Sequence, residues 1–436
     1  MTVRWRRRAY AVVALSMGAV LVAATAGCSK SGSGGGSNEK ITLIVDVFGT
    51  FGYEELYKQY EQQNPNIKIE ERGTGANLGD YTPKLLQYLA SGAGAGDLVA
   101  IEEGTLVQTK GQASKFEDLK NYGAAADEGN FLPWKWQQGQ TADGKLLGLG
   151  TDVGSMAMCY RSDLFAAAGL PTKREDVSAL WKTWDDYINV GKTFKSKVPN
   201  AGFIDAGTNT FNLILMQMAG AGNGYTYYDK SNNLVVDSNP VVKQAWDQTM
   251  KVISAGLSAK LQSWTDGWTT GFKNAQFATI ACPAWMTGVI KGNAGDGAFG
   301  KWDIAAAPGG GGNWGGSFLA VPSQGKHKAE AAKLARFLTS PQGQIEAFKS
   351  KGNLPSSPQA LADTSVKNAV NDYFSNAPTG QIYAAGATAL RPVYLGPKNQ
   401  DIRDQVENAI RSVEQGSATP DAAWTKAVAD AKKVAA

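Results

Sequence analysis

Strand and helix patterns alternate over residues 41–101, and this alternation constrains the fold more than any other feature. Residues 41–47, ITLIVDV, form a mostly apolar run that is typical of a strand buried on both faces of a parallel sheet. An apolar stripe at helical spacing follows, formed by Tyr53, Leu56, Tyr57 and Tyr60. Residues 67–69 and 97–101 predict further strands, separated by a helix for which Asp80 is a candidate cap. This order of elements predicts an α/β lobe.

The rest of the chain is long enough for a second domain of the same kind. A length of 436 residues exceeds one ordinary hydrophobic core, so two domains are expected. Residues 144–171 predict a buried strand and a short helix that ends at Gly169 and Pro171. Later segments predict helices behind Thr183 and Asn239, strands over residues 278–285 and 318–322, and helices over residues 329–338 and beyond residue 402. The predicted class is therefore α/β throughout.

The N-terminal segment is predicted to be an export signal. Residues 1–27 begin with four arginines and continue as an apolar run, and small residues directly precede Cys28. The Ala-Gly-Cys sequence resembles a bacterial lipobox, which implies that Cys28 is lipidated and becomes the mature N-terminus. A retained transmembrane helix is the alternative, and export by the general or the twin-arginine route is left open. Residues 28–39 then form the lipidated cysteine and a flexible Gly/Ser-rich linker.

The charge balance gives no indication of a nucleic-acid partner. The whole chain has 43 basic and 39 acidic residues, but all four arginines of the signal segment leave with it. The mature protein would therefore carry 39 charges of each sign. A neutral balance of this kind points neither to nucleic acid nor to an anionic membrane surface.

Signatures of catalysis, cofactors and metals are weak in this sequence. His327 is the single histidine and lies among lysines, which disfavours a Ser-His-Asp triad, a Cys-His pair or a zinc site. The glycine-rich run at residues 309–316 has no lysine, and its tryptophan would obstruct a phosphate. We therefore expect no cofactor, no metal and no enzymatic activity. Paired carboxylates of a glycoside hydrolase stay open, because Asp and Glu are abundant.

Several segments resemble one known family. Residues 144–171, GKLLGLGTDVGSMAMCYRSDLFAAAGLP, resemble the interdomain crossover of extracellular solute-binding proteins that serve carbohydrate importers of the ATP-binding-cassette type. The segments VDVFGTFGYEELYKQYE, ACPAWM and NWGGS look most like those of actinobacterial cellobiose- and cello-oligosaccharide-binding lipoproteins. The resemblance covers nearly all of residues 40–436. It implies two lobes, each a sheet flanked by helices, joined by hinge crossovers around residues 151–155.

The resemblance also implies a division of the chain and a function. Residues 40–151 and 283–325 would form the N-terminal lobe, and residues 152–282 and 326–436 the C-terminal lobe. The protein would be a lipid-anchored monomer on the outer face of the cell membrane. It would capture a short oligosaccharide, most simply cellobiose or cellotriose, by cleft closure and deliver it to the permease subunits and ATPase of an importer. Another disaccharide such as chitobiose or maltose, a secreted glycoside hydrolase, and a surface adhesin are the alternatives.

Two cysteines remain after Cys28 is assigned to the lipid. Cys159 and Cys282 both lie on predicted buried strands. By the family's layout these strands are neighbours at the hinge, which implies a disulfide as one option. Free thiols in the core are the other option.

Sugar rings present C–H faces that pack on flat aromatic side chains, so aromatic residues outside helical stripes are the first candidates. Trp314 is flanked by glycines and Trp285 follows a proline, and we expect both rings in the cleft, with a core position as the alternative. Trp264 and Trp268 are weaker candidates, because their spacing also fits one core-facing helical turn. Phe51, which follows the first strand, is another weak candidate.

Polar partners for sugar hydroxyls come next. Glu102 and Glu103 follow a predicted strand at its carboxyl end, where ligands meet α/β sheets, although a solvated pair is equally consistent. Asp152 lies at the implied hinge and would face either the cleft or a hinge hydrogen bond. Asn313, beside Trp314, can donate and accept. Asn209 and Phe211 are included because the resemblance places their segment at the sugar.

Overall fold

The structure, a computed structural model, describes residues 40–387 and 390–436. The predicted signal segment, Cys28 and the linker lie outside the described residues. None of the helices in the described part combines the length and the apolarity that a membrane crossing demands.

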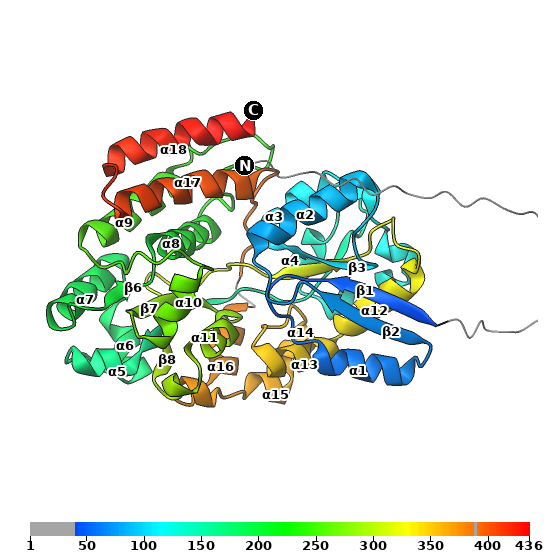
Figure 1. Cartoon of the computed structure of the whole chain (residues 1–436), viewed down its shortest axis with the longest axis horizontal. Coiled ribbons are helices and arrows are strands. Elements are labelled where there is room, and N and C mark those ends of the chain that lie inside the picture. The colour runs from blue at the N-terminus through cyan, green and yellow to red at the C-terminus, as the bar shows by residue number, and fades with distance from the viewer. Residues whose placement is uncertain (1–39, 388–389) are drawn as a thin grey trace, which may run out of the picture. The chain divides into compact units, whose positions relative to one another are not determined.

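The first sheet has the strand order β2-β1-β3-β9-β4. Figure 1 labels β1, β2 and β3 of this sheet. Its strands are β1 (Ile41–Asp46), β2 (Ile67–Arg72), β3 (Leu98–Glu102), β4 (Gly148–Gly150) and β9 (Ser317–Ala320). β1 pairs in parallel with β2 and β3, whereas β9 runs antiparallel to β3 and β4. Leu98 and Val99 of β3 belong to separate hydrophobic clusters, one on each face of the sheet. Burial on both faces explains the continuous apolar run, and the predicted α/β class is confirmed.

Helices cover the first sheet, and we call this sheet with its helices the first lobe. They are α1 (Glu54–Gln63), α2 (Leu78–Ser91), α3 (Glu103–Lys110), α4 (Pro133–Gln138), α12 (Lys328–Leu338) and α13 (Pro341–Lys351), with the 3-10 turns η1 (Ala113–Lys115), η2 (Leu119–Tyr122) and η3 (Ala124–Asn130). α1 buries Leu56 and Tyr60 of the predicted stripe. The predicted cap of α2 is wrong by three residues, because Asn77 caps this helix and its side chain accepts a hydrogen bond from the Asp80 amide (2.9 Å).

The second sheet has the strand order β6-β7-β5-β8. Its strands are β5 (Met156–Arg161), β6 (Gly202–Ile204), β7 (Phe277–Pro283) and β8 (Trp302–Ala305). β7 is parallel to β6, and β5 is antiparallel to both of its neighbours. Every residue of β7 is buried, which accounts for its apolar sequence, and the strand ends at Pro283, two residues before the predicted end.

The helices around this sheet complete the second lobe. They are α5 (Ser162–Ala167), α6 (Arg174–Leu180), α7 (Trp184–Lys197), α8 (Gly207–Ala221), α9 (Pro240–Ser254), α10 (Asp266–Lys273), α11 (Met286–Ala294), α14 (Pro358–Ala362), α15 (Thr364–Lys367), α16 (Thr379–Ala387), α17 (Asn399–Glu414) and α18 (Pro420–Ala435), with η4 (Asp296–Ala298) and η5 (Asp372–Phe374). Thr183 caps α7 through a reciprocal capping box with Asp186, as its position predicted. α17 and α18 lie side by side (Figure 1).

Within the described residues the chain passes between the two sheets at three segments, which we call the first, second and third crossovers. They are residues 151–155, 306–316 and 352–357. The predicted lobe boundaries are wrong for β8 and α12. β8 pairs with β5 of the second sheet, and α12 packs in the core of the first sheet. The physical reason is that the chain rejoins the first sheet only at β9 and stays there through α12, whereas α13 contributes side chains to the cores of both lobes.

The structure joins Cys159 of β5 and Cys282 of β7 in a disulfide, with 5.3 Å between their Cα atoms. The two strands are antiparallel neighbours in the second sheet. The bond therefore connects two adjacent strands within one lobe and crosses neither the hinge nor the cleft.

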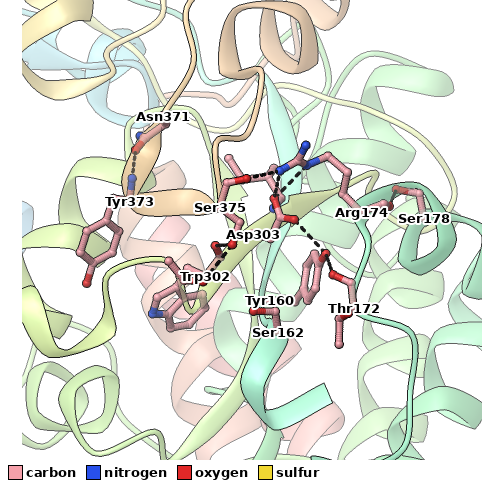
Figure 2. A network of polar contacts seen from close by, with 12 residues as sticks. Tyr160, Ser162, Thr172, Arg174, Ser178, Trp302, Asp303, Asn371, Tyr373 and Ser375 are labelled. Atoms are coloured by element: carbon pink, nitrogen blue, oxygen red, sulfur yellow. Dashed lines mark hydrogen bonds and ion pairs between the residues drawn. The ribbon is translucent and has the colours of Figure 1, made fainter. Parts of the chain in front are cut away.

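A polar network closes the outer edge of the second sheet at β8 (Figure 2). Arg174, which begins α6, forms an ion pair with Asp303 of β8 (2.9 Å) and donates a hydrogen bond to the Ser375 carbonyl (2.8 Å). The Tyr160 hydroxyl contacts Asp303 (3.2 Å) and the Thr172 carbonyl (2.8 Å). Because β8 is an edge strand, these contacts occupy a side that would otherwise be open to pairing with another chain.

Candidate functional site

The crossovers meet at a backbone contact around Gly154. The Val153 amide donates to the Leu354 carbonyl (2.9 Å), and the Trp314 amide donates to the Gly154 carbonyl (2.9 Å). A Cβ atom at Gly154 would lie 1.9 Å from the Trp314 carbonyl oxygen, so no larger residue fits there. The first crossover is thus held between the other two, at the position predicted for the hinge.

Glu103 connects the first lobe to the second crossover. It begins α3 directly after β3, is 3% exposed, and accepts hydrogen bonds from Gln138 Nε2 and Asn313 Nδ2, both at 2.7 Å. Asn313 in turn accepts a hydrogen bond from the Gly154 amide through its Oδ1 (2.8 Å). Burial raises the pKa of Glu103, while the nearby Lys135 opposes the rise. Glu103 is therefore a buried, hydrogen-bonded carboxylate, and the alternative of a solvated pair is wrong for it.

Asp152 is also buried and faces the hinge. It is 7% exposed and accepts hydrogen bonds from the Thr151 hydroxyl (2.6 Å) and the Ser317 amide (2.9 Å). Burial raises the pKa of Asp152, and Lys135 opposes this rise as well. Of the two roles expected for Asp152, the structure shows the hinge hydrogen bonds.

A small cavity of about 30 Å³ lies between the lobes. Residues of both lobes and of the second crossover line it, among them Glu102, Glu103, Asn212, Tyr227, Trp314 and Arg403. Burial raises the pKa of Glu102 to about 7, with Glu103 adding to the rise and Arg403 opposing it. Pockets for small ligands are roughly ten times larger or more, so a sugar can enter here only if the lobes separate.

An aromatic row on the second lobe leads to Trp314, which lines the cavity. Trp285, just beyond β7, is partly buried, and its indole N–H donates to the Trp314 carbonyl (3.1 Å). The Trp264 ring stacks on Trp285, with 6.2 Å between centroids and 24° between planes. Trp264 is 52% exposed and has a positive φ of 66°, so the loop before α10 turns its ring outward. Trp264 is therefore the exposed end of this aromatic row.

Trp268 has a different environment from Trp264. It is 1% exposed within α10, which begins only after Trp264, so the predicted shared helical turn is wrong. Its indole N–H donates to Asp205 (2.8 Å), which also accepts from Asn209 Nδ2 (2.5 Å). Burial raises the pKa of Asp205 to about 7. Asn209 therefore supports Asp205 at the carboxyl end of β6.

Three expected ligand contacts lie in the hydrophobic core instead. Phe211 (0% exposed) and Trp268 pack among buried side chains of the second lobe, and Phe51 (6% exposed) packs in the first. Trp314 is only 9% exposed and also belongs to the core of the second lobe, although it lines the cavity. We remove Phe211, Trp268 and Phe51 from the candidate site.

Asp205, Lys135 and Arg403 were missed by the sequence analysis. Asp205 follows β6 directly, and a polar residue at the carboxyl end of a strand is the same signal that selected Glu102. Lys135 and Arg403 lie on helices, α4 and α17, and nothing in their sequence context separates them from surface residues.

The fold and the site define a two-lobed binding protein with a hinge of crossovers. The sequence profile of bacterial extracellular solute-binding proteins matches residues 55–374, and the chain belongs to this family. The arabinooligosaccharide-binding protein of Bacillus subtilis (strain 168) is 25% identical over 439 residues, with 95% of this chain and 97% of the relative covered.

Solved structures agree with the fold. A crystal structure described as an extracellular solute-binding protein of family 1 is 41% identical, with a TM-score of 0.79 and with 91% of this chain and 100% of that chain covered. A transporter-associated binding protein from B. animalis subsp. lactis Bl-04, in complex with beta-1,6-galactobiose, is 22% identical, with a TM-score of 0.77 and coverage of 91% and 99%. The second likeness concerns the fold alone.

Proposed function

We propose that this protein captures short, neutral oligosaccharides between its lobes and delivers them to an ATP-binding-cassette importer. The observation that carries the proposal is the aromatic row from the exposed Trp264 through Trp285 to Trp314, which lines the cavity. The C–H face of a sugar ring packs on such a surface, and polar groups in the cleft satisfy its hydroxyls. The names of the relatives, which bind arabinooligosaccharides and galactobiose, support this class of ligand.

Polar partners for the hydroxyls come from both lobes. Glu102 and Arg403 line the cavity from opposite lobes. The hydroxyls of Thr226 and Tyr227, two further lining residues, are buried without a hydrogen-bond partner among the described residues. Buried hydroxyls normally have a partner, so these groups are suited to a bound sugar or to ordered water. Ligand contacts from both lobes favour closure about the hinge, which is how a binding protein signals occupancy.

We propose cellobiose or cellotriose as the preferred ligand, on the resemblance to cello-oligosaccharide-binding lipoproteins. A flat β-linked glucan suits stacked aromatic rings. Chitobiose and maltose share the same flat, hydroxyl-rich chemistry and are the alternatives within this class. The importer's permease subunits and ATPase are the proposed protein partners, and the binding protein itself would act as a monomer.

Binding without catalysis is favoured over glycoside hydrolysis. A hydrolase needs two carboxyl groups that face one glycosidic bond. Glu103 and Asp152 are instead engaged in hydrogen bonds to the hinge, and Asp205 in bonds to Trp268 and Asn209. His327, the single histidine, lies at the start of α12 on the first lobe.

Replacing Trp264 by alanine is expected to weaken cello-oligosaccharide binding by at least roughly tenfold, because the exposed ring of the aromatic row is lost. The melting temperature of the free protein should change little, since the ring is 52% exposed. Calorimetric titration of wild type and variant against a panel of disaccharides and trisaccharides measures the affinities. Trp424→Ala is the matched control, because Trp424 is a partly buried tryptophan of α18 that packs on Trp246, outside the cleft.

Unchanged affinity in Trp264→Ala would show that the aromatic row is not part of the binding site. An activity that releases glucose from cellotriose and co-purifies with the protein would favour a glycoside hydrolase. Scattering curves that stay the same at saturating sugar would argue against closure.

We also propose that Cys28, outside the described residues, carries a lipid that holds the protein at the outer face of the cell membrane. Cys28→Ala is expected to leave the protein unprocessed or released into the medium. Cell fractionation together with mass spectrometry of the native N-terminus measures this. A native N-terminus that begins downstream of Cys28 without a lipid would contradict the anchor.

A further inference from the structure

Lys135 is a fully buried lysine at the hinge. It lies on α4 of the first lobe, and its side chain is 0% exposed. Its ammonium lies 4.1 Å from the centroid of the Phe318 ring, and among the described residues it has no hydrogen-bond partner. A buried charge without a close partner is costly, so a position of this kind calls for an explanation.

The side chain of Lys135 reaches the crossovers through two glycines. A Cβ at Gly150 would lie 2.7 Å from Lys135 Cγ, and a Cβ at Gly316 would lie 2.9 Å from its Nζ. Gly150 directly precedes the first crossover, and Gly316 ends the second. Ser356 of the third crossover donates to the Gly150 carbonyl (3.0 Å). Lys135 therefore lies where all three crossover segments converge.

Carboxylates surround this ammonium on several elements. Burial lowers the pKa of Lys135, whereas Glu103, Asp152 and Glu102 oppose the change in that order. Among the described residues, Lys135 takes part in no ion pair. Beyond these groups, the charge of Arg403 on α17 opposes the rise in the pKa of Glu102. Burial raises the pKa of Tyr53, which lies ahead of α1, and the charge of Asp152 adds to this rise. Tyr53 stays neutral at physiological pH.

We propose that Lys135 is a positioning residue of the hinge, whose buried charge holds the crossovers together and so sets the balance between lobe arrangements. Glu103 is hydrogen-bonded to the second crossover through Asn313, and Asp152 belongs to the first. Two carboxylates in a buried region repel one another. The ammonium offsets this repulsion without fixing either partner in a salt bridge, which leaves the crossovers free to shift during closure. This role rests on the proposed cleft closure.

Loss of the charge makes the hinge sensitive to pH. Without Lys135 the pKa values of Glu103 and Asp152 rise further, because their counter-charge is gone. At low pH protonation removes the repulsion, and the hinge keeps its wild-type geometry. As the pH rises through the raised pKa values, both carboxylates ionise, repel one another and drive the first two crossovers apart.

Lys135→Met, a substitution of similar shape, tests this in the ligand-free protein, so that the result is independent of which sugar binds. We expect its radius of gyration by small-angle scattering to match wild type at the acidic end of a pH series and to depart from it increasingly as the pH rises. Its melting temperature should also fall more steeply with pH than that of wild type. The variant Lys135→Met/Asp152→Asn removes one charge of each sign. We expect its radius of gyration and its melting temperature to depend on pH as those of wild type do.

Lys110→Met is the matched control, because Lys110 of α3 is a partly buried lysine for which burial, without a carboxylate, lowers the pKa to about 8. Its radius of gyration should follow wild type at every pH. Parallel pH profiles for Lys135→Met and wild type would overturn the proposal, as would an equal response of Lys110→Met. If Lys135→Met does not fold, the double variant decides: failure of the double variant to fold would show that Lys135 acts through packing instead of charge.

Discussion

Replacing Cys159 and Cys282 together by alanine is expected to lower the free energy of unfolding by about 2–5 kcal/mol, the largest stability effect that we predict for the described residues. The disulfide joins residues separated by 123 positions. A cross-link that closes so long a loop restricts the unfolded chain strongly, and the chain-entropy description puts the effect near the upper end of this range. Urea unfolding at neutral pH measures the difference.

Wild-type protein whose disulfide has been reduced by dithiothreitol is the control. Its free energy of unfolding should be close to that of the double variant, because both proteins lack the cross-link and otherwise differ only slightly in packing. Sugar affinity below the melting transition should be retained, because the bond lies within the second sheet and does not cross the hinge. A double variant within about 1 kcal/mol of wild type would contradict a stabilising disulfide.

Replacing Asp205 by asparagine is expected to make the protein more stable at pH 8, by as much as about 4 kcal/mol, and to remove one source of pH dependence. Burial raises the folded-state pKa of Asp205 from 3.8 to about 7. Its contribution to stability is therefore fully present below about pH 4 and is lost as the pH rises to about 7. Asparagine has no charge to bury. Its Oδ1 can still accept from Trp268 and Asn209, which both donate to the same carboxylate oxygen.

Urea unfolding of the ligand-free protein between pH 4 and pH 8 measures this effect. Asp185→Asn is the control, because Asp185 is exposed and hydrogen bonds from Gln248 and Lys251 lower its pKa. The free energy of unfolding of Asp185→Asn should not increase relative to that of wild type as the pH rises. A stability difference between Asp205→Asn and wild type that stays constant from pH 4 to pH 8 would show that Asp205 is not a buried, titrating group.

Much of the local structure could be predicted from the sequence, because local signals decided it. The apolar runs that became β1, β3 and β7 are strands buried on both faces, and the stripe of α1 faces the core. Thr183 and Asn239 cap the helices that follow them. The boundaries of the lobes were harder to predict, because the sequence patterns of β8 and α12 are the same whichever sheet these elements join.

The candidate site could be predicted only in part. Trp314 and the carboxylates at the end of β3 line the cavity, and Trp285 contacts Trp314, but their role in binding stays a prediction. Phe211 was a candidate only because the resemblance places its segment at the sugar, and it packs in the core, while Trp264 is 52% exposed. Exposure of a side chain depends on its neighbours in space, and sequence spacing does not contain that information.

By itself the sequence determined the α/β class, the strands and helices, and the family to which the chain belongs, because these follow from periodicity, capping residues and motif order. The tertiary structure alone decided which strands share a sheet, which tryptophans face the cleft, and that Lys135, Glu103 and Asp152 meet at the hinge. These three residues come from separate segments of the chain. Electrostatic energy depends on distance and burial, and both are properties of the folded chain.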